Sequence, residues 1–177
     1  MNKRIFVASL AALLVVAAGC TTTTTGTGDP AARRKAIDAA VDSSLSNLYQ
    51  QVQGSQELVG RAAGVLVFPN VMEAGFVVGA SRGSGALRVG GKTVSYHATT
   101  SGSLGLQAGA QSTAVFLLFM TQDALRNFQN SRGWTVGATA QMTTATAQQP
   151  VVGYVLSNRG LMAGVTIDGA RVTRLDL

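Results

Sequence analysis

The sequence predicts an α+β fold: a curved, mostly antiparallel sheet or partial barrel, with a long N-terminal amphipathic helix and a second short helix. Two observations predict it. Apolar residues recur with helical spacing after residue 29, and glycine-rich segments of strand length fill most of the chain that follows. The length of 177 residues fits one domain with a sizeable core.

The long helix is expected from Pro30 to about Val52. Asp29 suits the N-cap position, and proline suits the first helical position. Gly54 ends the helix, and the segment after it, to about residue 62, predicts a short helix. The helical stripe comprises Ile37, Val41, Leu45 (or Ser44), Leu48 and Val52.

Segments rich in Val, Leu, Phe and Thr predict strands, and glycine-containing turns separate several of them. One further helix is expected from Thr121 as its cap to about Asn130. The expected strands are 64–68, 74–81, 85–89, 93–99, 103–109, 114–120, 135–142, 151–157, 161–167 and 171–175. The expected turns are Arg82-Gly83-Ser84, Gly90-Gly91, Asn158-Arg159-Gly160 and Asp168-Gly169.

The N-terminal segment has the layout of a bacterial lipoprotein signal. A short basic start precedes an apolar run that is too short to span a bilayer, and small residues precede Cys20, the single cysteine. We therefore expect residues 1–19 to be a removed signal peptide, 20–28 a lipidated cysteine with a flexible Thr/Gly tether, and 29–177 one domain. Thr21 in place of aspartate favours the outer membrane, with the domain facing the periplasm. An ordinary cleaved signal with a chance cysteine is the alternative.

The chain carries a formal charge of +6, and basic residues outnumber acidic ones in its second half. This charge favours anionic partners such as lipid head groups, although a generally basic surface that aids solubility gives the same pattern. Nucleic acid is not expected, because an exported chain without alternating aromatic and basic residues lacks a stacking platform.

Enzymatic motifs are weak. Residues 86–93 resemble a phosphate-binding loop, but the alternating pattern that follows predicts a strand, so Gly90-Gly91 is better explained as a hairpin turn. His97 is the single histidine, which argues against a zinc site, and a hydrolytic pairing with Ser95, Ser101 or Ser103 lacks a nucleophile elbow. Trp134 is expected in or beside the core. We expect no enzyme activity, cofactor or metal.

Several unusual strings resemble the SYLF domain family. They are GVLVFPNV at 64–71, AGFVVG at 74–79, SGSLGLQAGAQ at 101–111 and SNRGLM at 157–162. The resemblance covers roughly residues 34–175 and implies a non-enzymatic domain that binds anionic lipid head groups, with phosphoinositides as ligands in eukaryotes. It also implies actin binding in eukaryotic members, which we do not expect of an exported protein.

The predicted function is therefore a membrane-anchored lipoprotein whose domain binds anionic or phosphorylated lipid head groups. A structural or envelope-stress lipoprotein that acts through protein contacts is the alternative. Arginine and lysine suit phosphate, and residues at turns are exposed. The candidate head-group ligands are Arg82, Arg88, Lys92, Arg132 and Arg159.

Overall fold

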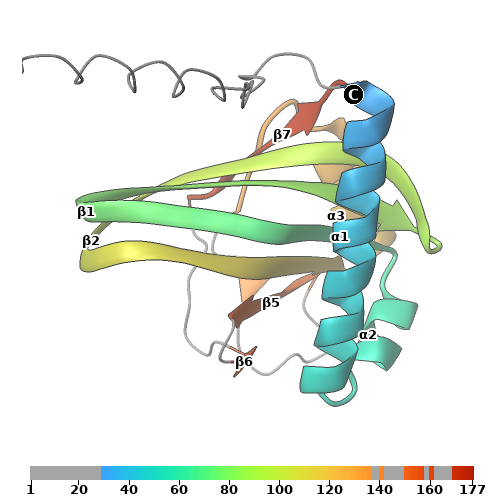
Figure 1. Cartoon of the computed structure of the whole chain (residues 1–177). Coiled ribbons are helices and arrows are strands. Elements are labelled where there is room, and N and C mark those ends of the chain that lie inside the picture. Colours follow the sequence, from blue (N-terminus) through green and yellow to red (C-terminus); the bar gives the residue numbers. More distant parts are fainter. Residues whose placement is uncertain (1–28, 137–139, 142–149, 158–159, 162–168) are drawn as a thin grey trace, which may run out of the picture.

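The computed structural model describes residues 29–136, 140–141, 150–157, 160–161 and 169–177 (Figure 1). The expected signal peptide, Cys20 and the tether lie outside the described residues, as does Arg159. The helices are α1 (Pro30–Gln51), α2 (Ser55–Arg61) and α3 (Gln122–Asn130). The strands are β1 (Gly64–Val89), β2 (Lys92–Phe119), β3 (Trp134–Thr135), β4 (Ala140–Gln141), β5 (Val151–Ser157), β6 (Gly160–Leu161) and β7 (Arg171–Leu175).

The helices begin and end close to the residues that the sequence predicts. Asp29 caps α1, because its carboxylate accepts a hydrogen bond from the Ala31 N–H at 3.0 Å. Gly54 adopts φ +79° after α1, a conformation that suits glycine and turns the chain into α2. Thr121 caps α3 through the Ala124 N–H at 3.2 Å.

Two very long strands replace six of the expected shorter ones. β1 and β2 form one antiparallel hairpin whose pairs run from Val89–Lys92 at the turn to Gly64–Phe119 at the far end. Gly90 and Gly91 have φ of +57° and +78°, which confirms the predicted turn. The predicted turn at 82–84 is wrong, because these residues pair with β2 inside β1.

The hairpin folds back on itself, and glycines make the close approach possible. A Cβ on Gly83 would lie 2.9 Å from the carbonyl oxygen of Asn70, and one on Gly85 would collide with the carbonyl oxygen of Val67. Residues 64–71 of β1 therefore lie against residues 83–88 of the same strand. Glycine in these strands thus serves close backbone contact and not a chain reversal.

The remaining strands extend the curled sheet from the edge of β2 that lies opposite β1. β5 pairs antiparallel with residues 113–119 of β2, and β7 pairs antiparallel with residues 96–100 of the same strand. β3 continues the sheet beyond β7, and β4 pairs parallel with β5. The α+β fold with a curled, mostly antiparallel sheet is confirmed.

Both faces of the sheet are covered, by different helices. α1 crosses one face (Figure 1), where its residues Ile37, Val41 and Leu48 pack in a cluster with alternate residues of β1, β2 and β5. On the opposite face, Leu125 and Phe128 of α3 pack in a second cluster. The sheet is therefore the middle layer between α1 and α3.

Candidate functional site

Strand register brings two arginines to the same side of the sheet. Arg82 of β1 pairs with Thr100 of β2, Thr100 pairs with Arg171 of β7, and Arg171 pairs with Thr135 of β3. Residues directly opposite each other on neighbouring strands project from the same face. All four are exposed, so the sheet presents a polar line with arginines on both sides of a threonine.

A third arginine adjoins this line. Arg132 precedes Gly133, and the Gly133 backbone lies beside the guanidinium of Arg171: a Cβ built on Gly133 would be 3.3 Å from a terminal nitrogen of Arg171. Arg132 is exposed. We call the set Arg82, Thr100, Arg132, Thr135 and Arg171 the arginine row.

The line lies on the same face of the sheet as α1. Tyr96 is on this face, because its hydroxyl donates to Asp38 of α1 at 2.8 Å, and Thr100 follows it at an even spacing along β2. Burial and the hydrogen bond to Asp38 raise the pKa of Tyr96, and the positive charges of Arg34 and Arg88 partly offset this.

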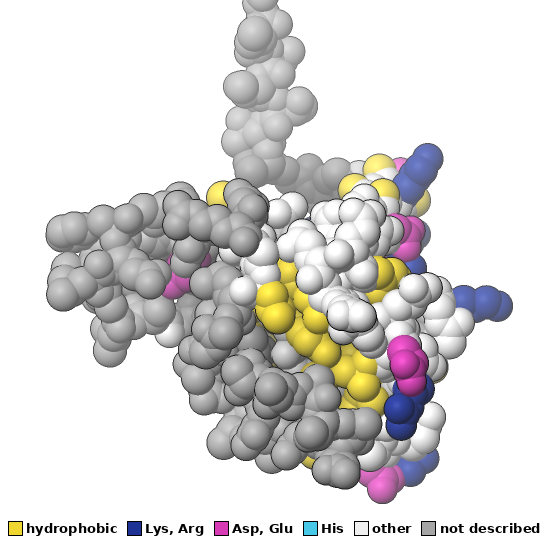
Figure 2. All heavy atoms as spheres, turned by 90° about the horizontal axis from the view of Figure 1, so that it is seen from below, with side chains coloured by type: hydrophobic (Ala, Val, Ile, Leu, Met, Phe, Trp, Pro, Cys, Tyr) yellow, Lys and Arg dark blue, Asp and Glu magenta, His cyan; other side chains and the backbone are white. Residues whose placement is uncertain are grey.

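No carboxylate neutralises the arginine row within the described residues. The ion pairs of this part of the chain join carboxylates to Arg61, Arg88 and Arg126 instead. Other parts of the surface have mixed charge: from below, Lys and Arg alternate with Asp and Glu along one edge, beside a group of hydrophobic side chains (Figure 2). The arginine row thus differs from that face because all of its charged side chains are positive.

The structure brings only some of the expected ligands together. Arg82 and Arg132 belong to the arginine row, whereas Lys92 is exposed at the hairpin turn, roughly 25 Å along β2 from Thr100 at the usual rise per residue. Arg159 lies outside the described residues. Arg171 was missed because its sequence neighbourhood shows no motif.

Arg88 is already engaged with α1. Its guanidinium lies 2.5 Å from the Asp42 carboxylate and 4.0 Å from that of Asp38, and its side chain is only 16 % exposed. Asp38 also accepts hydrogen bonds from Thr93 and Tyr96 at 2.8 Å each. These contacts fasten α1 to the hairpin, which gives Arg88 a structural role.

His97 lies in an apolar environment on the opposite face. Burial, and secondarily the positive charge of Arg174, lower the pKa of its imidazole from 6.5 to about 4. Its Nε2 is 2.8 Å from the Ser95 hydroxyl, and its ring packs 5.0 Å from that of Phe128. None of these contacts supplies the carboxylate that orients the histidine of a hydrolytic triad.

The other weighed motifs have structural roles. Gly90 and Gly91 connect two strands, so the phosphate-loop resemblance has no helix N-terminus behind it. Trp134 packs edge-on against Phe128 at 5.4 Å and is half-buried, as expected of a residue at the core boundary.

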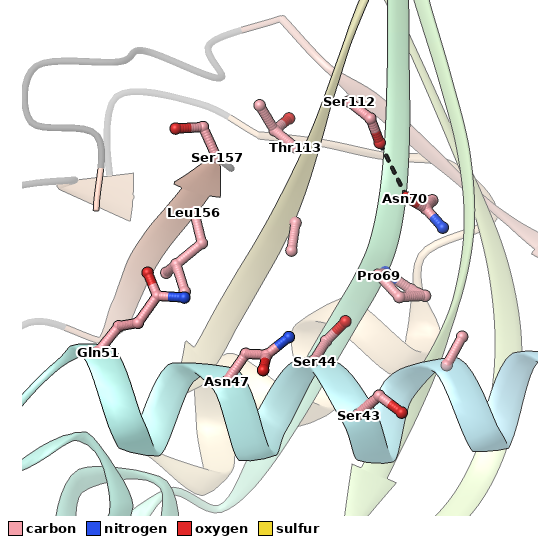
Figure 3. Close-up of a pocket in the computed structure, with 12 residues that line it drawn as sticks. Ser43, Ser44, Asn47, Gln51, Pro69, Asn70, Ser112, Thr113, Leu156 and Ser157 are labelled. Carbon is pink, nitrogen blue, oxygen red and sulfur yellow. Dashed lines mark hydrogen bonds between the residues drawn. The ribbon is translucent and has the colours of Figure 1, made fainter. Parts of the chain in front are cut away.

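A polar cleft between α1 and the sheet was not anticipated from the sequence. Its cavity is about 350 Å³, and its walls come from α1, β1, β2 and β5 (Figure 3). Hydroxyl and amide side chains predominate, with Asn47 and Gln51 on the helix side. The sequence signal for this cleft is a polar helix face, with Ser44, Asn47 and Gln51 spaced three and four residues apart. That face indicates a cleft only once the strand order shows which part of the sheet it meets.

Two features are absent from the described residues. No group of three or more histidine, cysteine or acidic side chains lies together as a metal site would need. Within the same residues, no helix has the length and apolar character needed to cross a bilayer.

Comparison with known families adds one match. Residues 100–176 match the family model described as Ysc84: Las17-binding protein actin regulator. The match confirms the resemblance to the SYLF family. The SYLF-type segment contains every member of the arginine row except Arg82, together with α3, β5 and β7. No curated protein matches the chain.

Proposed function

We propose that the chain is a lipid-anchored, non-enzymatic bacterial protein whose SYLF-type domain binds anionic or phosphorylated lipid head groups through the arginine row. The observation that carries the proposal is the register that places Arg82 and Arg171 on either side of Thr100, exposed and on one face. The SYLF resemblance supports a lipid ligand, and the positive charge supports an anionic one.

The geometry suits a phosphate group. Two strand spacings separate the backbones of Arg82 and Arg171, which is roughly 10 Å. Arginine side chains from both sides can converge above Thr100, where each offers a planar fork of donors. The Thr100 hydroxyl supplies a further donor between them. A paired sheet holds these residues in fixed positions, which limits the entropy lost on binding.

The proposed anchor suits such a ligand. A tether from lipidated Cys20 to Asp29 would span at most about 30 Å when fully extended. The exposed basic residues Arg33 and Lys35 follow in the first turns of α1. We therefore propose that this end of the domain faces the membrane, in the periplasm and at the outer membrane. The proposal does not extend to actin, which an exported protein does not meet.

Vesicle binding tests the head-group site. Residues 29–177 would be mixed with neutral phosphatidylcholine vesicles and with vesicles that also contain an anionic phospholipid, and bound protein measured by sedimentation. We expect binding to the anionic vesicles that weakens steeply between low and physiological salt. Replacing Arg82 and Arg171 by alanine should weaken it by about tenfold or more, since each arginine makes charge-assisted hydrogen bonds.

The matched control removes the same charge elsewhere. The double variant Arg61→Ala/Arg126→Ala loses two exposed arginines of the helices. Equal loss in both double variants would show that only net charge matters, and unchanged binding in Arg82→Ala/Arg171→Ala would exclude the arginine row. Binding to vesicles that is insensitive to salt would indicate apolar contact with lipid in place of the arginine row, and no binding to either kind of vesicle would favour the alternative of protein contacts.

The anchor is tested independently. The full chain, expressed in bacteria with labelled palmitate, should incorporate the label and fractionate with membranes. The Cys20→Ser variant should incorporate none. Label in that variant would place the modification elsewhere and remove the proposed anchor.

A further inference from the structure

The cleft between α1 and the sheet lies apart from the arginine row and has a different chemistry. Ser44, Asn47 and Gln51 approach it from successive turns of α1, while Thr113 of β2 and Leu156 of β5 form the opposite wall (Figure 3). The cavity of about 350 Å³ is within the size range of small-molecule sites. Helix and sheet thus enclose it between rigid elements.

Several polar groups in the cleft lack a partner among the described residues. Asn70 and Ser112 bond to each other at 2.8 Å. No hydrogen bond to another described side chain or backbone group engages the side-chain amides of Asn47 and Gln51. The hydroxyl of Ser44 likewise has no hydrogen-bond partner among the described residues, and this residue is 9 % exposed. Hydroxyl and amide groups that are open to the cleft and unpaired among the described residues can form hydrogen bonds with a ligand that enters it.

The lining excludes two ligand classes. Among the described residues no charged side chain lines the cavity, so none of them offers a counter-charge to a phosphate or carboxylate. A peptide cannot be added as a strand at this point, because Thr113 of β2 pairs with Val71 of β1 on one side and Ser157 of β5 on the other. The backbone of β2 at Thr113 is therefore already paired on both sides, so recognition at this point depends on side chains.

Hydroxyl and amide groups match a ligand that both donates and accepts hydrogen bonds at many points. Amides of asparagine and glutamine do both, and so do serine and threonine hydroxyls. Pro69 and Leu156 add apolar surface at the walls, on which the C–H face of a sugar ring can pack. A neutral saccharide combines these features: many hydroxyl groups, no charge and an apolar ring face.

We propose that this cleft is a binding site for a neutral saccharide, with Asn47, Gln51 and Ser44 as its hydrogen-bonding residues. The site would bind one or two sugar rings between α1 and β5. It acts independently of the arginine row, since the two share no residue.

Saturation-transfer NMR tests the proposal. The full chain would be held in micelles of a detergent without sugar groups and mixed at millimolar concentration with maltose, cellobiose, lactose and N,N′-diacetylchitobiose in turn. We expect saturable transfer to the ring protons of at least one disaccharide. The variant Asn47→Ala/Gln51→Ala should weaken that binding by about tenfold, as expected for the loss of two hydrogen bonds.

The controls separate a specific site from surface contact. Both substituted residues are exposed on a helix, where alanine is well tolerated. Gln50→Ala removes an exposed amide of α1 outside the cleft and should leave binding unchanged. No transfer to any of the four disaccharides would overturn the proposal, as would equal binding by Asn47→Ala/Gln51→Ala and the unaltered chain.

Discussion

Acidification should destabilise the domain through its single histidine. The His97 side chain is buried and its pKa is lowered from 6.5 to about 4. In the unfolded chain the imidazole takes up a proton near its ordinary pKa, whereas the folded chain does so only near pH 4. Between these values the unfolded chain binds more protons, so the free energy of unfolding falls as pH falls. Above about pH 7 the imidazole is neutral in both the folded and the unfolded chain, so its effect on the free energy of unfolding vanishes.

The size of the effect follows from the two pKa values. Between about pH 7.5 and pH 5, protonation of the unfolded state alone should remove about 2 kcal/mol from the free energy of unfolding. The loss should approach about 3 kcal/mol at lower pH, where it levels off because the folded state also takes up the proton. Carboxylates titrate in the same range, so the histidine contribution must be isolated by a variant.

Urea unfolding of residues 29–177 and of His97→Gln at the two pH values provides that comparison. Glutamine keeps a polar side chain beside Ser95 but does not titrate. The unaltered domain should lose about 2 kcal/mol more than the variant between the two pH values. NMR of the lone imidazole gives a direct second reading. Parallel pH dependence of the two proteins, or a histidine that titrates near 6.5, would refute the reasoning.

Two further perturbations test the packing. Gly85→Ala places a Cβ against the carbonyl oxygen of Val67, so we expect the free energy of unfolding in urea to fall by about 2–3 kcal/mol. The control Gly102→Ala has open space at its Cβ and should lower it by less than about 1 kcal/mol. Equal losses in the two variants would contradict the described approach of the two halves of β1. Asp38→Ala removes the carboxylate that accepts hydrogen bonds from Thr93 and Tyr96, and should lower the free energy of unfolding by about 2 kcal/mol. Asp42→Ala should lower it clearly less, because the Asp42 side chain is 64 % exposed. A larger loss in Asp42→Ala would place the main attachment of α1 elsewhere.

Local signals predicted the helices and the hairpin turn well. The cap at Asp29, the apolar spacing of α1 and the positive φ of Gly90 and Gly91 are all determined within a few residues. The same reasoning failed at Gly83. A glycine beside arginine and serine is typical of a turn, but here the missing side chain lets two segments of one strand approach each other.

The candidate site depended on contacts between distant segments. Arg82 was chosen because an exposed turn was expected there; it is exposed, but within β1, and its neighbour Arg171 is set by a register between strands far apart in the sequence. The engagement of Arg88 by Asp38 and Asp42 likewise requires knowledge of where α1 crosses the hairpin. Composition predicted a basic surface and the sequence offered Arg82 and Arg132 as members, whereas Arg171 could be found only from the strand order.

The long hairpin also bears on how the chain can reach this structure. Its first pair, Val89 with Lys92, closes only the Gly90–Gly91 turn, and each later pair encloses a segment that is already ordered. Pairing can therefore spread outward from the turn at little additional loop-closure entropy. β7, by contrast, must find residues of β2 that lie about 70–80 positions away along the chain. The arginine row is thus completed only when the last strand docks, whereas the hairpin that carries its first arginine can form locally.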